Sequence, residues 1–232
     1  MVFICRYFRR LVLVALGEAA DWLGELAFCD DMAVAQQKNY QIWHHRQTCV
    51  ARLGAAVRER DLAHCARMLE DDSKNYHVWS YRQWAVLFHN ATTEEDAFSR
   101  LMIERDVRNN SAWNERFWVA ERLGWLADPA AAAAEVEFAL QQARRAPSNE
   151  SPWLYLRGIA QRAPAAVDVA RLEQLAAQWV LCVPVRALLV HLHEKRGDVA
   201  AAVRLCRECA DTVDTVRAKY WNYKAAAVAS KM

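Results

Sequence analysis

One pattern recurs four times along the chain: an Asn stands four residues before a Trp, and an Arg follows that Trp by three or four residues. The tryptophans of the four copies are 36, 34 and 40 residues apart. A repeat of that length corresponds to two helices of about a dozen residues each, with their turns. Only 6 Gly and 5 Pro occur in 232 residues, too few for the frequent turns of an all-β fold. The sequence therefore predicts an all-α fold of helical hairpins.

The spacing inside each copy places its Asn, Trp and Arg on one stripe of a helix, because positions i, i+4 and i+7 share a face. We expect the Asn to cap the helix, the Trp to pack against the neighbouring hairpin, and the Arg to reach backbone carbonyls or a carboxylate of the adjacent repeat. The residues assigned to this structural role are Asn39, Trp43, Arg46, Asn75, Trp79, Arg82, Asn109, Trp113, Arg116, Asn149, Trp153 and Arg157.

The repeats predict an α-α superhelix, a solenoid of helical hairpins similar to tetratricopeptide repeats, in one domain over residues 1–232. Residues 22–165 hold the motif-bearing repeats, and residues 166–232 are expected to form carboxyl-terminal helices. Residues 1–21 are interpreted as a partial or degenerate first repeat, in which Arg9 stands 37 residues before Arg46. We therefore expect the chain to begin inside a repeat whose earlier part is missing or has diverged. Residues 55–69 and 94–105 carry apolar residues at helical period and are expected to be partner helices.

Bulk properties exclude several classes of protein. A net charge of +2 with 25% charged residues is balanced and indicates neither a polybasic nucleic-acid binder nor an acidic tail. The apolar run over 11–16 is too short for an export signal, and no run is long enough to span a membrane. Seven irregularly spaced Cys residues are typical of reduced thiols. We expect a cytoplasmic protein with no stable membrane insertion and no nucleic-acid partner.

The repeated Asn-Tyr-x-x-Trp-x-x-Arg resembles the signature of protein prenyltransferase α subunits, and most of all the α subunit shared by farnesyltransferase and type I geranylgeranyltransferase. The segments that carry the resemblance are 38–46, 106–114, 149–153 and 214–221, and it extends over about residues 22–226. The resemblance implies a crescent of hairpins around a separate β subunit, which binds prenyl diphosphate and a catalytic zinc. The complex, with magnesium, would transfer the prenyl group to the cysteine of carboxyl-terminal CaaX motifs of protein substrates. The α chain would be active only with its β subunit.

Only the first two copies carry Lys-Asn-Tyr, whereas the third has Arg-Asn-Asn and the fourth Ser-Asn-Glu. Cations and phenols stabilise the charge that develops on a leaving diphosphate. The resemblance implies that Lys38 contacts the diphosphate and that Tyr40, Tyr76 and His77 line the same pocket. It places Gln41 near the carboxyl end of the acceptor peptide. The catalytic candidates are Lys38, Tyr76 and His77, and the substrate-binding candidates are Tyr40, Gln41 and Lys74. The alternative role for Tyr40 and Tyr76 is simple packing.

No metal site or cofactor is expected in this chain. Cys206-x-x-Cys209 has no second ligand pair and is interpreted as two structural cysteines. His191 and His193 would point to different faces of a helix, as would the adjacent His44 and His45.

Two alternative functions fit the same repeats. The α subunit of Rab geranylgeranyltransferase shares the motif but usually carries further domains. A non-catalytic tetratricopeptide-like scaffold would bind peptides and has a similar period, but its signature lacks Asn-Tyr-x-x-Trp-x-x-Arg.

Overall fold

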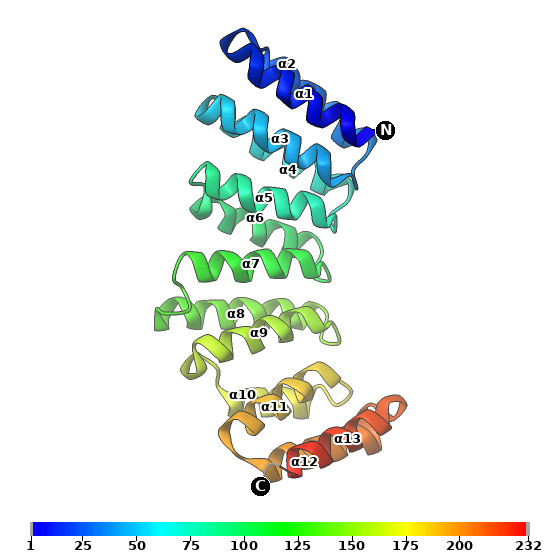
Figure 1. The fold of residues 1–232 in the computed structure, drawn as a ribbon. Helices are drawn as coiled ribbons and strands as arrows, with labels where there is room; N and C mark the ends of the chain where they lie inside the picture. The colour runs from blue at the N-terminus through cyan, green and yellow to red at the C-terminus, as the bar shows by residue number, and fades with distance from the viewer. Residues whose placement is uncertain (1, 231–232) are drawn as a thin grey trace. The chain divides into compact units, whose positions relative to one another are not determined.

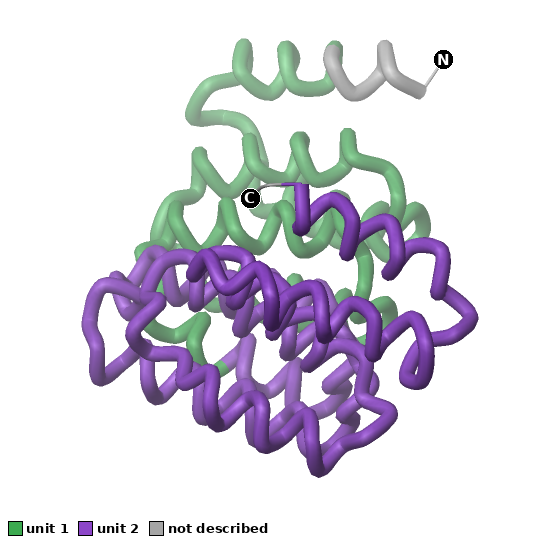
Figure 2. Tube along the Cα trace, turned by 90° about the horizontal axis from the view of Figure 1, so that it is seen from below, with its two compact units in different colours: residues 1–97 green, residues 98–232 purple. Residues whose placement is uncertain are grey.

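A computed structural model describes residues 2–230 of the chain, and the side chains of residues 8–230. The side chains of the first seven residues, which belong to the expected partial repeat, lie outside the described residues. All regular structure within 2–230 is helical and no strand occurs there, which confirms the predicted all-α fold of hairpins. The chain forms two compact units, residues 1–97 and residues 98–232 (Figure 2). The single-domain organisation stays a prediction.

Among the described residues, the first unit holds five complete α-helices and the beginning of a sixth. The helices are α1 (Val2–Leu16), α2 (Trp22–Ala35), α3 (Tyr40–Leu53), α4 (Arg58–Asp71), α5 (Tyr76–Phe88) and α6 (Thr92–Arg105), the last of which contains the boundary between the units. Within the first unit, α2 packs against α3 and α4 against α5, while α3 lies along both α1 and α5 (Figure 1).

The second unit continues the same alternation of paired helices. Its helices are α7 (Asn110–Arg122), α8 (Pro129–Arg145), α9 (Glu150–Arg162), α10 (Val169–Gln178), α11 (Val183–Arg196), α12 (Val199–Glu208) and α13 (Ala218–Ala229). Among them, α9 packs against α8, α7 and α11, and α12 packs against α11 and α13. Short helical turns span Gly17–Ala19, Gly54–Val57, Pro164–Ala166, Cys209–Val213 and Thr215–Arg217.

The partner helices expected over 55–69 and 94–105 are present as α4 and α6, shifted by two or three residues at their starts. Gly54 ends α3 with a φ of 62° and Gly197 ends α11 with a φ of 78°, a conformation that glycine adopts without steric cost. Gly54 and Gly197 thus mark helix ends, whereas Gly24 and Gly158 lie inside α2 and α9. No helix within the described residues combines the length and the apolar character needed to cross a bilayer.

Candidate functional site

The Asn and Trp of each motif together fix the loop that leads into the motif helix. Asn39, Asn75, Asn109 and Asn149 are the N-caps of α3, α5, α7 and α9, and each side chain accepts a hydrogen bond from a backbone N–H of the first turn. Each Trp indole donates to the carbonyl oxygen six residues earlier. The acceptors are Gln37 at 3.3 Å, and Ser73, Val107 and Pro147 at 2.9 Å. In the first two repeats the residue after that carbonyl is a lysine, Lys38 or Lys74.

The motif arginines of the first three copies are buried and paired with a carboxylate on the next helix. The pairs are Arg46 with Asp61 at 2.9 Å, Arg82 with Glu95 at 2.7 Å, and Arg116 with Glu135 at 2.6 Å, and Arg46 also contacts Asp30. Tyr81 and Tyr155, each two residues after a motif Trp, donate to Asp61 and Glu135 respectively. The Arg of one repeat and the Tyr of the next thus share one acid.

Arg157, the arginine of the fourth motif copy, is not buried like the arginines of the first three copies. Leu156 takes the buried position three residues after Trp153, and Arg157 on the next position is exposed. A one-residue shift turns a side chain by about 100° around the helix, which explains the difference. Outside the four motif copies, Arg9 of α1 pairs with Glu25 of α2 at 2.5 Å, and Arg186 of α11 pairs with Glu208 at 2.8 Å.

The six residues proposed by resemblance lie at the amino-terminal ends of α3 and α5. We call Lys38, Tyr40, Gln41, Lys74, Tyr76 and His77 the exposed Lys/Tyr set. Tyr40 is 58% exposed and Tyr76 is 76% exposed, so neither phenol belongs to the core. Both lysines are exposed, and Gln41 and His77 are half-buried. The rings of Tyr76 and His77 meet edge to face, with centroids 5.7 Å apart.

The two halves of this set emerge from neighbouring helices. α3 and α5 pack along each other, and the ring centroids of Trp43 and Tyr81, both in the first halves of their helices, are 5.1 Å apart. The starts of the two helices therefore lie on the same side of the first unit. Ammonium groups, phenols and helix amino termini favour an anionic ligand with several oxygen atoms. The structure is compatible with that chemistry, and the individual roles of the six residues remain predictions.

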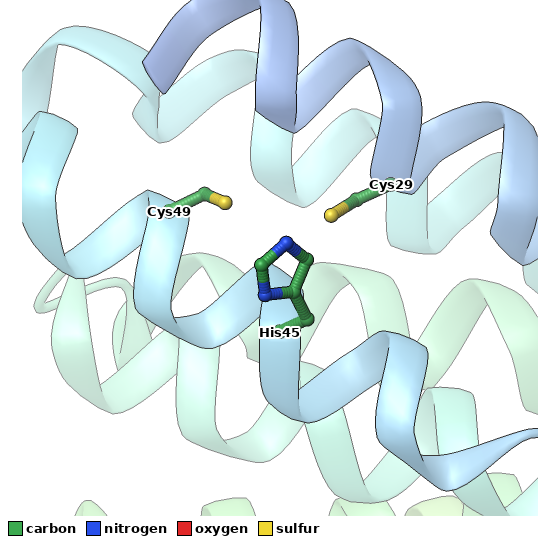
Figure 3. A group of neighbouring side chains, drawn as sticks. All are labelled: Cys29, His45 and Cys49. Atoms are coloured by element: carbon green, nitrogen blue, oxygen red, sulfur yellow. The ribbon is translucent and has the colours of Figure 1, made fainter. Parts of the chain in front are cut away.

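A second group of reactive side chains is not evident from the sequence. Cys29 of α2 and His45 and Cys49 of α3 place their ligand atoms within 4.8 Å of one another, and all three are buried (Figure 3). We call these three residues the thiol–imidazole cluster. Glu25, one turn before Cys29, lies beside it, with Oε1 2.5 Å from His45 Nε2. The sequence signal is a pair of i, i+4 spacings, Glu25/Cys29 and His45/Cys49, which place each pair on one helix face.

The pKa values of the three side chains in the thiol–imidazole cluster are shifted in different directions. The contact with Cys49 and burial raise the pKa of the Cys29 thiol, whereas the contact with Cys29 lowers the pKa of Cys49. Burial also lowers the pKa of His45, although Glu25 opposes that shift. The imidazole is therefore held neutral more readily than a free histidine. By contrast, Cys206, Cys209, His191 and His193 join no group of three potential metal ligands among the side chains described.

Comparison with known proteins places this architecture in a family. The family described as "Protein prenyltransferase alpha subunit repeat" matches the chain over residues 22–53, 58–89, 92–123 and 132–163, more than half of its length. Each matched repeat ends with the helix that carries the motif, which is α3, α5, α7 or α9. The fold and these matches define a protein built of helical-hairpin repeats. The chain belongs to the protein prenyltransferase α-subunit family.

Relatives and a solved structure agree with that assignment. The chain is 31% identical over 133 residues to the protein farnesyltransferase/geranylgeranyltransferase type-1 subunit alpha of Dictyostelium discoideum, over 53% of this chain and 41% of that protein. It is 39% identical over 69 residues to the subunit of the same name from Pisum sativum, over 28% of this chain and 20% of that protein. A structure of Candida albicans protein geranylgeranyltransferase-I complexed with GGPP aligns with a TM-score of 0.82 and 25% identity, over 97% of this chain and 78% of the matched chain. The matches span less than half of these curated relatives.

Proposed function

We propose that this chain is the α subunit of a heterodimeric protein prenyltransferase of the farnesyltransferase/geranylgeranyltransferase type I class. In that role it completes the active site of a zinc-bearing β subunit, which transfers a prenyl group from prenyl diphosphate to the cysteine of a CaaX motif. Zinc would lower the pKa of the acceptor thiol, and the resulting thiolate would displace diphosphate from C1 of the prenyl chain. Two relatives bearing that subunit's name, and the resemblance to a geranylgeranyltransferase, support the proposal.

The observation that carries the proposal is the exposure of the Lys/Tyr set at two adjacent helix starts. Residues that only pack repeats together would be buried, as Trp43 and Trp79 are. Tyr40 and Tyr76 instead expose more than half of their surface. We assign Lys38 to the leaving diphosphate, with Tyr40, Lys74, Tyr76 and His77 around the same anion and Gln41 near the acceptor peptide.

Co-expression with a farnesyltransferase-type β subunit tests the proposal. A stable complex that prenylates a CaaX peptide is the expected result, and each subunit alone should be inactive. A monomer with no affinity for the β subunit would instead support the peptide-binding scaffold. Transfer to Rab proteins but not to CaaX peptides would favour the Rab-type alternative.

Lys38→Ala tests the site within that complex, with Lys195→Ala, an exposed lysine of α11, as the matched control. Lys38→Ala should slow single-turnover prenyl transfer about tenfold or more, because the leaving diphosphate loses one cation. Zinc content and complex stability should not change in either variant. Equal rates for the two variants would remove Lys38 from the site.

A further inference from the structure

The thiol–imidazole cluster has the composition of a zinc site. Two thiols and one imidazole are ligands that zinc prefers, and copper(I) and iron–sulfur sites also take thiolates. All three residues are buried: Cys29 and His45 expose 1% of their surface and Cys49 exposes none. In Figure 3 the two sulfur atoms and one imidazole nitrogen point into the same small space between α2 and α3. The His45 imidazole thus lies near a carboxylate, that of Glu25, as well as near the two thiols.

The distances suit a tetrahedral ion. Zinc lies about 2.3 Å from sulfur and about 2.1 Å from nitrogen, so its ligand atoms are roughly 3.3–3.8 Å apart. The three ligand atoms of the cluster already lie within 4.8 Å of one another, and small rotations of the side chains would bring them to that separation. Both helices are held in place by their packing against each other, which fixes the two faces of the site.

Glu25 is a neighbouring candidate for the fourth ligand, and its carboxylate has to move toward the two sulfur atoms to bind, because it is not among the groups whose ligand atoms lie within 4.8 Å of one another. Its side chain is 4% exposed, and Oε1 lies 2.5 Å from His45 Nε2, at the edge of the cluster. Two thiolates, one carboxylate and one neutral imidazole around Zn²⁺ leave a single excess negative charge. The Arg9 guanidinium, which donates to both Glu25 oxygens at 2.5 and 2.6 Å, offsets that charge.

The surroundings favour a closed, structural site rather than a catalytic one. Leu26, Val50 and Val57 are buried around the two cysteines, and Trp22, Leu53 and Trp84 pack against them. Such a shell excludes the water that a catalytic zinc keeps as a ligand. Arg9 is about half exposed and stands between Glu25 and solvent, so it marks the side from which an ion can enter.

We infer that Cys29, Cys49, His45 and Glu25 form a zinc-binding site that clamps α2 to α3, within the first motif-bearing repeat. Binding converts both S–H groups to thiolates and releases their two protons to solvent. This site lies in the repeat core, is distinct from the exposed Lys/Tyr set, and is independent of the zinc proposed for a β subunit. The inference therefore stands or falls separately from the proposed function.

Cobalt binding to the reduced, full-length chain tests the inference without a β subunit. Tetrahedral Co²⁺ bound by thiolates gives intense visible bands and a sulfur-to-cobalt charge-transfer band, and one equivalent of Zn²⁺ should displace it. Cys29→Ala and Cys49→Ala should each weaken zinc affinity about 100-fold or more, because each removes a direct ligand. Cys65→Ala is the matched control, since Cys65 is a fully buried cysteine of α4 outside the cluster. The Cys65→Ala chain should bind zinc with the affinity of the wild-type chain.

Two further measurements keep the result interpretable. Glu25→Gln should retain the charge-transfer band but weaken affinity, which separates the carboxylate from the thiolates. Zn²⁺, but not Mg²⁺, should raise the thermal unfolding midpoint of the wild-type chain, even if a cysteine variant folds poorly. A wild-type chain that gives no cobalt band, or cysteine variants with unchanged affinity, would overturn the inference. If the oxidised chain forms a disulfide between Cys29 and Cys49, and the reduced chain gives no cobalt band, the two thiols would belong to redox chemistry instead.

Discussion

The indole Nε1 of Trp79 donates a hydrogen bond to the carbonyl oxygen of Ser73 at 2.9 Å, and the residue after Ser73 is Lys74 of the exposed Lys/Tyr set. Trp43 does the same for Gln37, the residue before Lys38, at 3.3 Å. The residue that packs the repeat thus also holds the loop that presents the lysine. In each of the two repeats, one hydrogen bond from the core tryptophan therefore links the packing of the repeat to the position of the proposed site lysine.

Trp79→Phe removes this hydrogen bond and keeps an aromatic ring in the core. We expect the free energy of unfolding to fall by about 1–3 kcal/mol, because the hydrogen bond from the indole to the Ser73 carbonyl is lost and the smaller ring leaves a space. Urea unfolding followed by circular dichroism measures the change. Trp118→Phe, at a half-buried position of α7 outside the motif, should cost less. A larger loss at Trp118 than at Trp79 would contradict the role given to the motif indole.

Asp61 is a buried acid of the first unit that contacts three other side chains. It is fully buried and accepts hydrogen bonds from Arg46 and from the Tyr81 hydroxyl, and His89 Nε2 lies 3.2 Å from its second oxygen. Asp61→Ala leaves the buried Arg46 guanidinium without this partner, so we expect a loss of about 3–5 kcal/mol.

The matched comparison for Asp61 is an exposed ion pair. Glu121 and Arg162 are 2.8 Å apart, and their side chains are 39% and 58% exposed. Glu121→Ala should therefore change the free energy of unfolding by less than about 1 kcal/mol. Denaturant titration of both variants measures the contrast. Similar losses at the two positions would show that burial does not set the strength of these pairs.

The repeated motif predicts the hairpins and their caps because it recurs at a fixed place in each repeat. It does not predict which acid each Arg meets, since Arg46, Arg82 and Arg116 lie 15, 13 and 19 residues before their partners. The acid is chosen by how two helices pack, and that information is not local. The thiol–imidazole cluster is hidden for the same reason, because His45 and its partner Cys29 lie on facing helices.

His64 of α4 makes stability depend on pH. Burial, followed by the charges of Arg46, Arg67 and Arg60, lowers the pKa of His64 from 6.5 to about 3. Asp30 lies 3.5 Å from Nδ1, but it also pairs with Arg46 and Arg60, which reduces its pull on a proton. As the pH falls below 6.5, the unfolded chain takes up a proton that the folded chain refuses. Stability is therefore complete above pH 6.5 and is lost toward pH 3.

The expected contribution of His64 is about 2 kcal/mol of stability lost between pH 7 and pH 5. His64→Gln cannot titrate, so its free energy of unfolding should fall less over the same interval. The difference between the two slopes isolates His64 from other titrating groups, His45 included. Parallel slopes would mean that His64 has the same pKa in the folded and unfolded chain.

Two tyrosines of α5 allow the same substitution to separate stability from activity. Tyr81 is 2% exposed, donates to Asp61 at 2.7 Å, and has its pKa raised by burial, so it stays a protonated donor. Tyr81→Phe leaves a buried carboxylate short of one donor and should cost about 1–3 kcal/mol. Tyr76 is 76% exposed, and Tyr76→Phe should change stability by less than about 0.5 kcal/mol.

For the rate of prenyl transfer in the complex with a β subunit, Tyr76→Phe should have the larger effect and Tyr81→Phe the smaller one. Tyr76→Phe removes a phenol from the proposed diphosphate pocket, so the single-turnover rate should fall about tenfold, equivalent to ~1.4 kcal/mol of transition-state stabilisation. Tyr81→Phe acts only through the fold and should leave the rate near that of the wild type at temperatures where the variant is folded. Because both changes remove one hydroxyl from the same helix, a Tyr76→Phe enzyme with full activity would assign the exposed phenol to a role other than chemistry.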